Sequence, residues 1–153
     1  MTIRIGLISD THGLLRPEAC DFLQGSHHII HAGDIGNPSV LQELAAIAQV
    51  TAVRGNNDTE QWAEALPANE WLQFGEVNIY VLHDLSELNI EPKAAGISVV
   101  ISGHSHKPSI DEREGVLYIN PGSAGPRRFK LPIAAAELVI VGTSVTPRIM
   151  HLE

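Results

Sequence analysis

The sequence predicts an α/β fold in which two mixed β-sheets pack face to face and are flanked by helices. One observation is that the first third alternates short apolar runs with helical segments in a βαβαβ order, which implies parallel strands. The other is that the remainder is richer in strands and contains two segments typical of β-hairpins. We expect a single domain over residues 1–153, a length that can bury one core.

The first third contains three expected strands and two expected helices. Residues 3–9 form a nearly continuous apolar run, as a strand buried on both faces should. Pro17 begins a short helix that reaches Phe22. Asn37-Pro38 begins a second helix, whose apolar residues recur at helical spacing. The other two expected strands cover residues 28–32 and 51–53.

The rest of the chain reads mainly as strands joined by short turns. One hairpin is expected across Gly75-Glu76 and a final one across Gly142-Thr143. A further turn is expected over residues 112–115, between two short strands. The expected strands of this part cover residues 71–74, 77–82, 98–102, 109–111, 116–120, 133–141 and 145–152.

Side chains able to bind metal recur at one structural position, just after the end of a buried strand. In open α/β sheets, functional residues gather in the crevice at the carboxyl ends of the strands. Five separate expected strands deliver such residues, which predicts a metal site at that edge. The candidate ligands are Asp10, His12, Asp34, Asn56, His83, His104 and His106.

The types and spacing of these residues are chemically coherent. Imidazole and carboxylate together suit Mn²⁺, Fe²⁺, Co²⁺, Ni²⁺ or Zn²⁺. Asp-x-His and His-x-His place alternate residues on the same side of an extended segment, so both can face one site. No thiolate takes part, because the one cysteine, Cys20, falls in an expected helix and is interpreted as a small buried residue. Glycines at positions 13, 33, 55 and 103 would let the backbone turn sharply beside the metals.

Composition excludes several classes of function. A net charge of −8 argues against general nucleic-acid binding. No apolar run approaches the roughly 20 residues needed to span a bilayer, so we expect no membrane association. The first residues lack the features of a signal peptide, and a single cysteine fits a reducing compartment. The expected location is the cytoplasm.

Five motifs resemble, in order and spacing, those of the calcineurin-like metallophosphoesterases. They are Asp10-Thr11-His12, Gly33-Asp34, Gly55-Asn56-Asn57-Asp58, His83 and Gly103-His104-Ser105-His106. The short chain and Asn120-Pro121-Gly122-Ser123 are similar to the small YfcE-type phosphodiesterase subfamily of bacteria and archaea. The resemblance implies a four-layer αββα sandwich.

The resemblance also implies a division of roles among these residues. Asp10, His12 and His106 would hold one divalent ion, and Asn56, His83 and His104 the other, with Asp34 bridging the two. Mn²⁺ is the first expectation, with Ni²⁺, Fe²⁺, Zn²⁺ and Mg²⁺ as alternatives. A water or hydroxide between the ions would attack a small phosphate-ester substrate. The expected catalytic residues are Asp34, Asn56, Asn57 and Asp58.

The sequence departs from the family pattern in two places. Many larger relatives carry a histidine where Asn57 stands, and that histidine is thought to protonate the leaving group. Asn57 cannot do so, which favours good leaving groups or protonation by solvent. Asp58 is interpreted as orienting a ligand or fixing its loop. After His83 the family usually has glycine, whereas this chain has Asp84-Leu85-Ser86-Glu87, a change that bears most on substrate identity.

Three alternatives to a phosphodiesterase stay open at this level. A phosphomonoesterase could use the same site. A non-catalytic scaffold would resemble a trafficking subunit of the eukaryotic retromer complex, which has this fold and lacks some ligands; here all seven ligand positions hold competent side chains. A DNA nuclease is disfavoured by the acidic charge and the absence of a basic, aromatic-rich patch.

Some residues outside the motifs receive weaker interpretations. Arg16, Arg127 and Arg128 are candidate contacts for a substrate anion, although a plain surface role is favoured for each. Among the remaining histidines, His31 is the one expected nearest to the site. An apolar surface from the strand-rich C-terminal half could form a homodimer.

Overall fold

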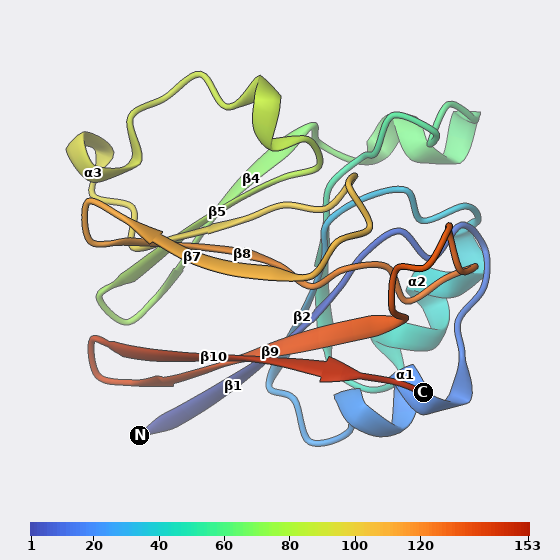
Figure 1. Cartoon of the computed structure of the whole chain (residues 1–153), viewed down its shortest axis with the longest axis horizontal. Coiled ribbons are helices and arrows are strands. Elements are labelled where there is room, and N and C mark those ends of the chain that lie inside the picture. The colour runs from blue at the N-terminus through green and yellow to red at the C-terminus, as the bar shows by residue number, and fades with distance from the viewer.

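The protein consists of two five-stranded mixed sheets, and the computed structural model describes all residues from Met1 to Glu153 (Figure 1). The first sheet has the strand order β10-β9-β1-β2-β3, and its members are β1 (Thr2–Ile8), β2 (His28–His31), β3 (Gln49–Ala52), β9 (Ala134–Val141) and β10 (Ser144–His151). The second sheet has the order β4-β5-β6-β8-β7, and its members are β4 (Asn69–Phe74), β5 (Val77–Leu82), β6 (Val99–Ile101), β7 (Ser109–Arg113) and β8 (Val116–Asn120).

Each sheet has a parallel centre with antiparallel strands at its edges. In the first sheet β1, β2 and β3 run parallel, and β9 and β10 add antiparallel strands beside β1. In the second sheet β5, β6 and β8 run parallel, and β4 and β7 pair antiparallel to them. The predicted mixture of parallel and antiparallel strands is therefore confirmed.

The main core lies between the two sheets. Ile5 and Leu7 of β1 meet Ile79 and Val81 of β5 in a cluster of 14 buried apolar residues. Successive strand side chains point to opposite faces, so the other face of β1, with Ile8, packs on the helical side. Burying both faces of the parallel strands is what their continuous apolar sequences require.

Helical segments cover both outer faces, as predicted. On the first sheet lie α1 (Pro17–Leu23) and α2 (Pro38–Ala45), each with proline in its first turn. The outer face of the second sheet is covered by the short segments η2 (Leu85–Glu87), a 3₁₀-helix, and α3 (Pro92–Ala95), which lie far from α1 and α2 in Figure 1. Another 3₁₀-helix, η1 (Gln61–Ala65), precedes β4. None of the helices is long and apolar enough to cross a membrane.

Most element predictions are confirmed within two residues, and the differences have local causes. Strand β3 begins at Gln49 rather than at residue 51, because α2 ends earlier than its apolar pattern suggests. The turn between β7 and β8 is Glu114-Gly115 rather than residues 112–115, so β7 continues to Arg113. Both turn residues have positive φ, 53° and 78°, as in the type I′ turns whose twist matches a hairpin. The short segments η1, η2 and α3 were not predicted.

Candidate metal centre

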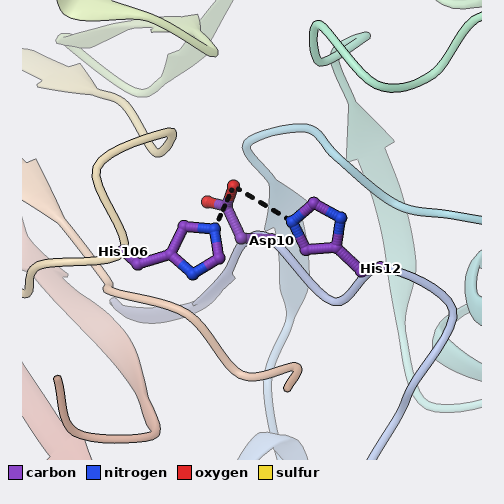
Figure 2. Close-up of side chains that lie close together, drawn as sticks. All are labelled: Asp10, His12 and His106. Atoms are coloured by element: carbon purple, nitrogen blue, oxygen red, sulfur yellow. Dashed lines mark ion pairs between the residues drawn. The ribbon is translucent and has the colours of Figure 1, made fainter. Parts of the chain in front are cut away.

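The predicted ligands come together at the carboxyl ends of β1, β2, β5 and β6. Their atoms form two overlapping groups, and Asp10 belongs to both. The first group comprises Asp10, His12 and His106, and the second comprises Asp10, Asp34 and His83. Figure 2 shows the first group, with both imidazoles directed at the Asp10 carboxylate. The ends of four strands thus deliver the side chains to one place, as the sequence pattern predicts.

Asp10 has one carboxylate oxygen held by the protein and one directed at the imidazoles. Oδ2 accepts hydrogen bonds from Ser9 Oγ at 2.6 Å and from the His104 backbone N–H at 3.0 Å. Oδ1 lies 3.3 Å from His106 Nε2 and 3.9 Å from the Nε2 atoms of both His12 and His83. Asp10 is fully buried, so its oriented oxygen is shielded from solvent.

His83 shows the same division between a held atom and a directed one. Its Nδ1 lies 2.7 Å from the carbonyl oxygen of Ala32. A carbonyl can only accept, so Nδ1 carries the proton and Nε2 has a free lone pair. Nε2 lies 3.3 Å from Asp34 Oδ2. Burial acts to lower the pKa of His83, but Asp34, Asp10 and the Ala32 carbonyl outweigh it and raise that pKa.

Asp34 is held by Asn57 and faces both groups. The backbone N–H of Asn57 donates to Oδ1 at 2.8 Å, and its side-chain amide donates to Oδ2 at 3.1 Å. Oδ2 also lies 3.7 Å from His12 Nε2. Burial alone would raise the pKa of Asp34, but the adjacent His83 imidazole and the hydrogen bond from the Asn57 backbone outweigh it and lower the pKa to about 2. Asp34 is therefore ionised, as a metal ligand must be.

Asn56 and His104 lie on the open side of the cluster. His104 Nδ1 is 3.1 Å from Asn56 Oδ1, so the amide oxygen and the imidazole face one another. The His104 side chain is 45% exposed, whereas that of His106 is 3% exposed. The cluster is therefore buried at His106 and accessible to a substrate at His104.

Several buried polar atoms in the cluster have no hydrogen-bond partner. They are Asp10 Oδ1, His12 Nε2, His83 Nε2 and His106 Nδ1. Buried polar groups are nearly always paired, because an unpaired one costs about 1–3 kcal/mol. Two of these atoms, the Nε2 atoms of His12 and His83, each lie 3.9 Å from a third, Asp10 Oδ1. Carboxylate and imidazole atoms that converge unpaired fit a divalent cation.

The backbone around the cluster is unusual. Seven residues other than glycine have positive φ, a conformation that side chains disfavour. Five of the seven are candidate ligands: Asp10, His12, Asp34, His104 and His106. Such conformations concentrate at functional sites, where the surrounding structure compensates for their strain. Gly55 contributes by its small size, because a Cβ there would overlap Asp34.

Asp58 fixes a loop and does not face the cluster. Its carboxylate accepts from the backbone N–H groups of Ile35 at 3.0 Å, Gly36 at 3.1 Å and Gly55 at 2.9 Å. These bonds tie the loop that carries Asn56 and Asn57 to the loop that carries Asp34. Of the two interpretations given for Asp58, the geometry supports loop fixing.

His31 links the loops that carry Asp10 and Asp34. It is fully buried, and burial lowers its pKa to about 3, so it is neutral. Its Nδ1 accepts from the Gly33 backbone N–H at 3.1 Å, which leaves the proton on Nε2 to donate to Thr11 Oγ1 at 3.0 Å. The Thr11 hydroxyl in turn donates to the Ile35 carbonyl at 2.8 Å.

Sequence reasoning assigned no role in the site to several residues that hold the cluster. Ser9 binds Asp10 Oδ2, and Ser123 Oγ donates to the Asp10 carbonyl at 3.0 Å. The Asn120 amide donates to the Gly103 carbonyl at 2.9 Å. Ser123 and Asn120 lie more than 15 positions from these partners, so no local pattern reveals the contacts. Ser9 carries no signal beyond its place before Asp10.

The three candidate arginines differ. Arg16 donates to the Gly125 carbonyl at 3.3 Å, and Arg127 donates to the Leu131 carbonyl at 3.1 Å. Arg128 lies near enough to the cluster to act on His106: burial lowers the pKa of His106, Asp10 opposes this, and Arg128 lowers it further.

The segment after His83 forms a wall beside the cluster. Asp84 caps η2, with Oδ1 accepting from Ser86 N at 3.0 Å and from Ser86 Oγ at 2.8 Å. A cavity of about 360 Å³ lies on one side, and its lining includes Asn56, His83 and Asp84. A second, of about 190 Å³, lies on the other and includes His104 and Asp84. The largest cavity, about 800 Å³, is lined by none of the candidate ligands.

Two mixed sheets with carboxylates and imidazoles converging at their strand ends define a class of α/β protein built around a metal site. The chain belongs to the calcineurin-like phosphoesterase superfamily, whose domain model matches residues 3–143. It is 38% identical to the probable metallophosphoesterase MJ0623 of Methanocaldococcus jannaschii, over 99% of this chain and 83% of that protein. It is 29% identical to the phosphodiesterase MJ0936 of the same organism, over 78% of this chain and 83% of that protein.

Solved structures share the fold at low sequence identity. Vacuolar protein sorting 29 from Cryptosporidium parvum has a TM-score of 0.79 and 18% identity, covering 97% of each chain. The phosphoesterase YfcE from E. coli has a TM-score of 0.73 and 19% identity, covering 99% of this chain and 100% of that one. The predicted family and fold are therefore confirmed.

Proposed function

We propose that the protein is a phosphodiesterase that acts with two bound divalent ions. The observation that carries the proposal is the division within Asp10 and His83, each of which has one atom held by the protein and another left free. In both residues the free atom is buried and unpaired. Orientation of this kind is what a metal ligand needs and what a merely structural polar group lacks.

The residues divide into two groups of ligands in this proposal. Asp10, His12 and His106 hold one ion on the buried side, and Asn56, His83 and His104 hold the other on the open side. Asp34, held by Asn57, lies between them and contributes to both. The chemistry that divalent ions supply in such a centre is activation of water and stabilisation of charge on phosphoryl oxygens.

The preference for a diester is supported by the shape and chemistry of the open side. A diester carries two alcohol arms, and the two cavities beside Asp84 offer room for one arm each. Asn57 uses its amide to hold Asp34 and has no proton to give to a departing alkoxide. Protonation by solvent suffices for a good leaving group, so aryl esters are suitable first substrates. The relative named as a phosphodiesterase adds support.

The test is metal-dependent hydrolysis by protein first stripped of metal. Bis(p-nitrophenyl) phosphate and p-nitrophenyl phosphate are assayed without metal and with Mn²⁺, Ni²⁺, Fe²⁺, Zn²⁺ or Mg²⁺, and Asp34→Asn is the control. We expect Mn²⁺ to restore turnover best and the diester to be preferred. Turnover of the monoester alone would assign a phosphomonoesterase. No turnover from protein that still binds two ions would favour the scaffold.

The candidate ligands offer oxygen and nitrogen atoms and therefore suit ions that prefer such ligands. The choice of Mn²⁺ is part of this proposal. The location in the cytoplasm, the single domain, the homodimer and the absence of nucleic-acid and membrane binding stay predictions.

A further inference from the structure

Asp84 stands where the family pattern has glycine, and its two carboxylate oxygens do different things. Oδ1 caps η2 through Ser86, which fixes the direction of the carboxylate. Oδ2 lies 3.7 Å from Nε2 of His104, which is too far for a hydrogen bond. The free oxygen therefore projects toward the open side of the metal centre.

Asp84 also separates the two cavities that flank the centre. It lines both the 360 Å³ cavity beside Asn56 and the 190 Å³ cavity beside His104. A phosphate held at these ligands would extend its ester arms past Asp84, whichever cavity they enter. The carboxylate is therefore placed to sense the charge of the bound phosphate.

No arginine or lysine forms an ion pair with Asp84. Arg113 lines the smaller cavity but is paired with Asp111 at 2.8 Å, and Arg54 lines the larger one without an ion pair to Asp84. Asp84 is ionised at neutral pH.

We propose that Asp84 is a specificity residue that favours phosphodiester monoanions over phosphomonoester dianions. The inference rests on the proposed function, because it concerns the substrate of that same site. A monoester carries one more negative charge than a diester at neutral pH, and the Asp84 carboxylate repels that charge. Specificity obtained by placing a repulsive charge against the wrong ligand is a general device.

The test compares Asp84→Asn with Glu87→Gln. Asparagine keeps the oxygen that accepts from Ser86, so η2 stays capped and only the charge is removed. Glu87→Gln removes a carboxylate from the same turn that also lines the larger cavity but forms no ion pair with a candidate ligand. For each protein loaded with Mn²⁺, kcat/KM is measured for bis(p-nitrophenyl) phosphate and p-nitrophenyl phosphate. Calorimetry gives the Kd of methyl phosphate and dimethyl phosphate.

Asp84→Asn is expected to raise the ratio of kcat/KM for the monoester to kcat/KM for the diester about tenfold. The variant should likewise bind methyl phosphate more tightly relative to dimethyl phosphate. Glu87→Gln is expected to shift the ratio less than about twofold. An unchanged ratio in Asp84→Asn, or an equal shift in both variants, would overturn the inference. If no ester is turned over with any metal, the proposed function fails, and the Kd ratio alone decides the role of Asp84.

Discussion

Buried polar side chains are paired near the amino ends of the central strands and unpaired near their carboxyl ends. Toward the amino ends, these groups are paired: Glu137 accepts from Arg4 at 2.7 Å and from Arg148 at 3.1 Å, and His28 Nε2 contacts Thr51 Oγ1 at 2.7 Å. At the carboxyl ends, four carboxylate or imidazole atoms are unpaired: Asp10 Oδ1, His12 Nε2, His83 Nε2 and His106 Nδ1.

The difference indicates that the amino ends stabilise the fold and that the carboxyl ends carry the functional site. Arg4 also donates to the Phe22 and Gln24 carbonyls at the end of α1, both at 2.6 Å, so its guanidinium serves the helix and the sheet together. The polar side chains of these pairs are therefore used within the fold. The unpaired atoms of the other end cost stability unless a cation satisfies them. Four experiments test this contrast.

The largest effect is expected from neutralising a buried carboxylate at each end. Asp10→Asn removes a buried charge that faces the imidazoles of His12, His83 and His106, so we expect kcat/KM for the aryl diester to fall on the order of 1,000-fold. Glu137→Gln removes a carboxylate that only pairs with arginines and should change kcat/KM less than about threefold. Steady-state kinetics with saturating Mn²⁺ measures both. A similar loss in the two variants would remove the functional distinction between the ends.

Removing metal should destabilise the wild-type protein but not Asp10→Asn. Only the folded chain gathers the ligands, so an ion at about 100 times its Kd adds about 2.7 kcal/mol to the free energy of unfolding. For a chain of this size the corresponding rise in Tm is about 5–10 °C. Thermal melting with chelator and with Mn²⁺ measures the difference. An equal rise in both proteins would show that the metal acts elsewhere.

The two buried His–Thr pairs of β2 offer a matched test by isosteric substitution. Thr11→Val breaks the link between His31 and the Asp34 loop, so we expect the affinity for Mn²⁺ to fall about 10–100-fold. Thr51→Val breaks the His28 pair at the other end and should lower stability by about 1 kcal/mol without changing metal affinity. Calorimetric titration of metal and melting of the metal-free proteins separate the two effects. Loss of affinity in Thr51→Val would contradict the assignment.

The smallest effect concerns acid stability at the amino ends. Burial acts to raise the pKa of Glu137, but hydrogen bonds from Arg148 and Arg4 outweigh it and hold the pKa below its ordinary value of 4.5. A depressed pKa means that this stabilisation is present above pH 4.5 and is lost as the pH falls through the folded-state value. The advantage of wild type over Glu137→Gln, under about 1 kcal/mol, should therefore shrink as the pH falls below 4.5 and vanish once the carboxyl is protonated in the folded protein.

Urea unfolding of the metal-free proteins at a series of pH values measures this advantage. Metal-free protein is used so that the release of bound metal at low pH does not contribute to the change in stability. An advantage for wild type that stays unchanged down to the most acidic pH at which the protein is folded would show that Glu137 stabilises the fold by packing rather than by its charge.

Much of the fold could be predicted because its signals are local. The continuous apolar run of residues 3–9 indicates a strand buried on both faces, and β1 lies between a helical layer and the second sheet. Gly75-Glu76 marks a hairpin turn, and β4 and β5 pair across it. The segments η2 and α3 were missed because they are shorter than the period that identifies a helix.

The candidate site could be predicted as a set of residues but not as an arrangement. Ligand-type side chains after successive strands indicate a shared edge, because parallel strands end on the same side. Which atom of each ligand is free could not be predicted. Asp58 shows the limit: its sequence motif groups it with Asn56, yet its carboxylate is used entirely by backbone amides.

The family, the α/β architecture and the residues able to bind metal can be inferred from the sequence alone. The signals for them are apolar period, turn chemistry and motif spacing, which are properties of neighbouring residues. The tertiary structure is needed to show that Asp10 belongs to both overlapping groups, one with His12 and His106 and the other with Asp34 and His83. It is also needed to place Asp84 between two cavities. The contacts responsible join residues far apart in the chain, such as His83 with Ala32 and His104 with Asp10. Strand order and the packing of the two sheets bring these residues together, and no local pattern specifies either.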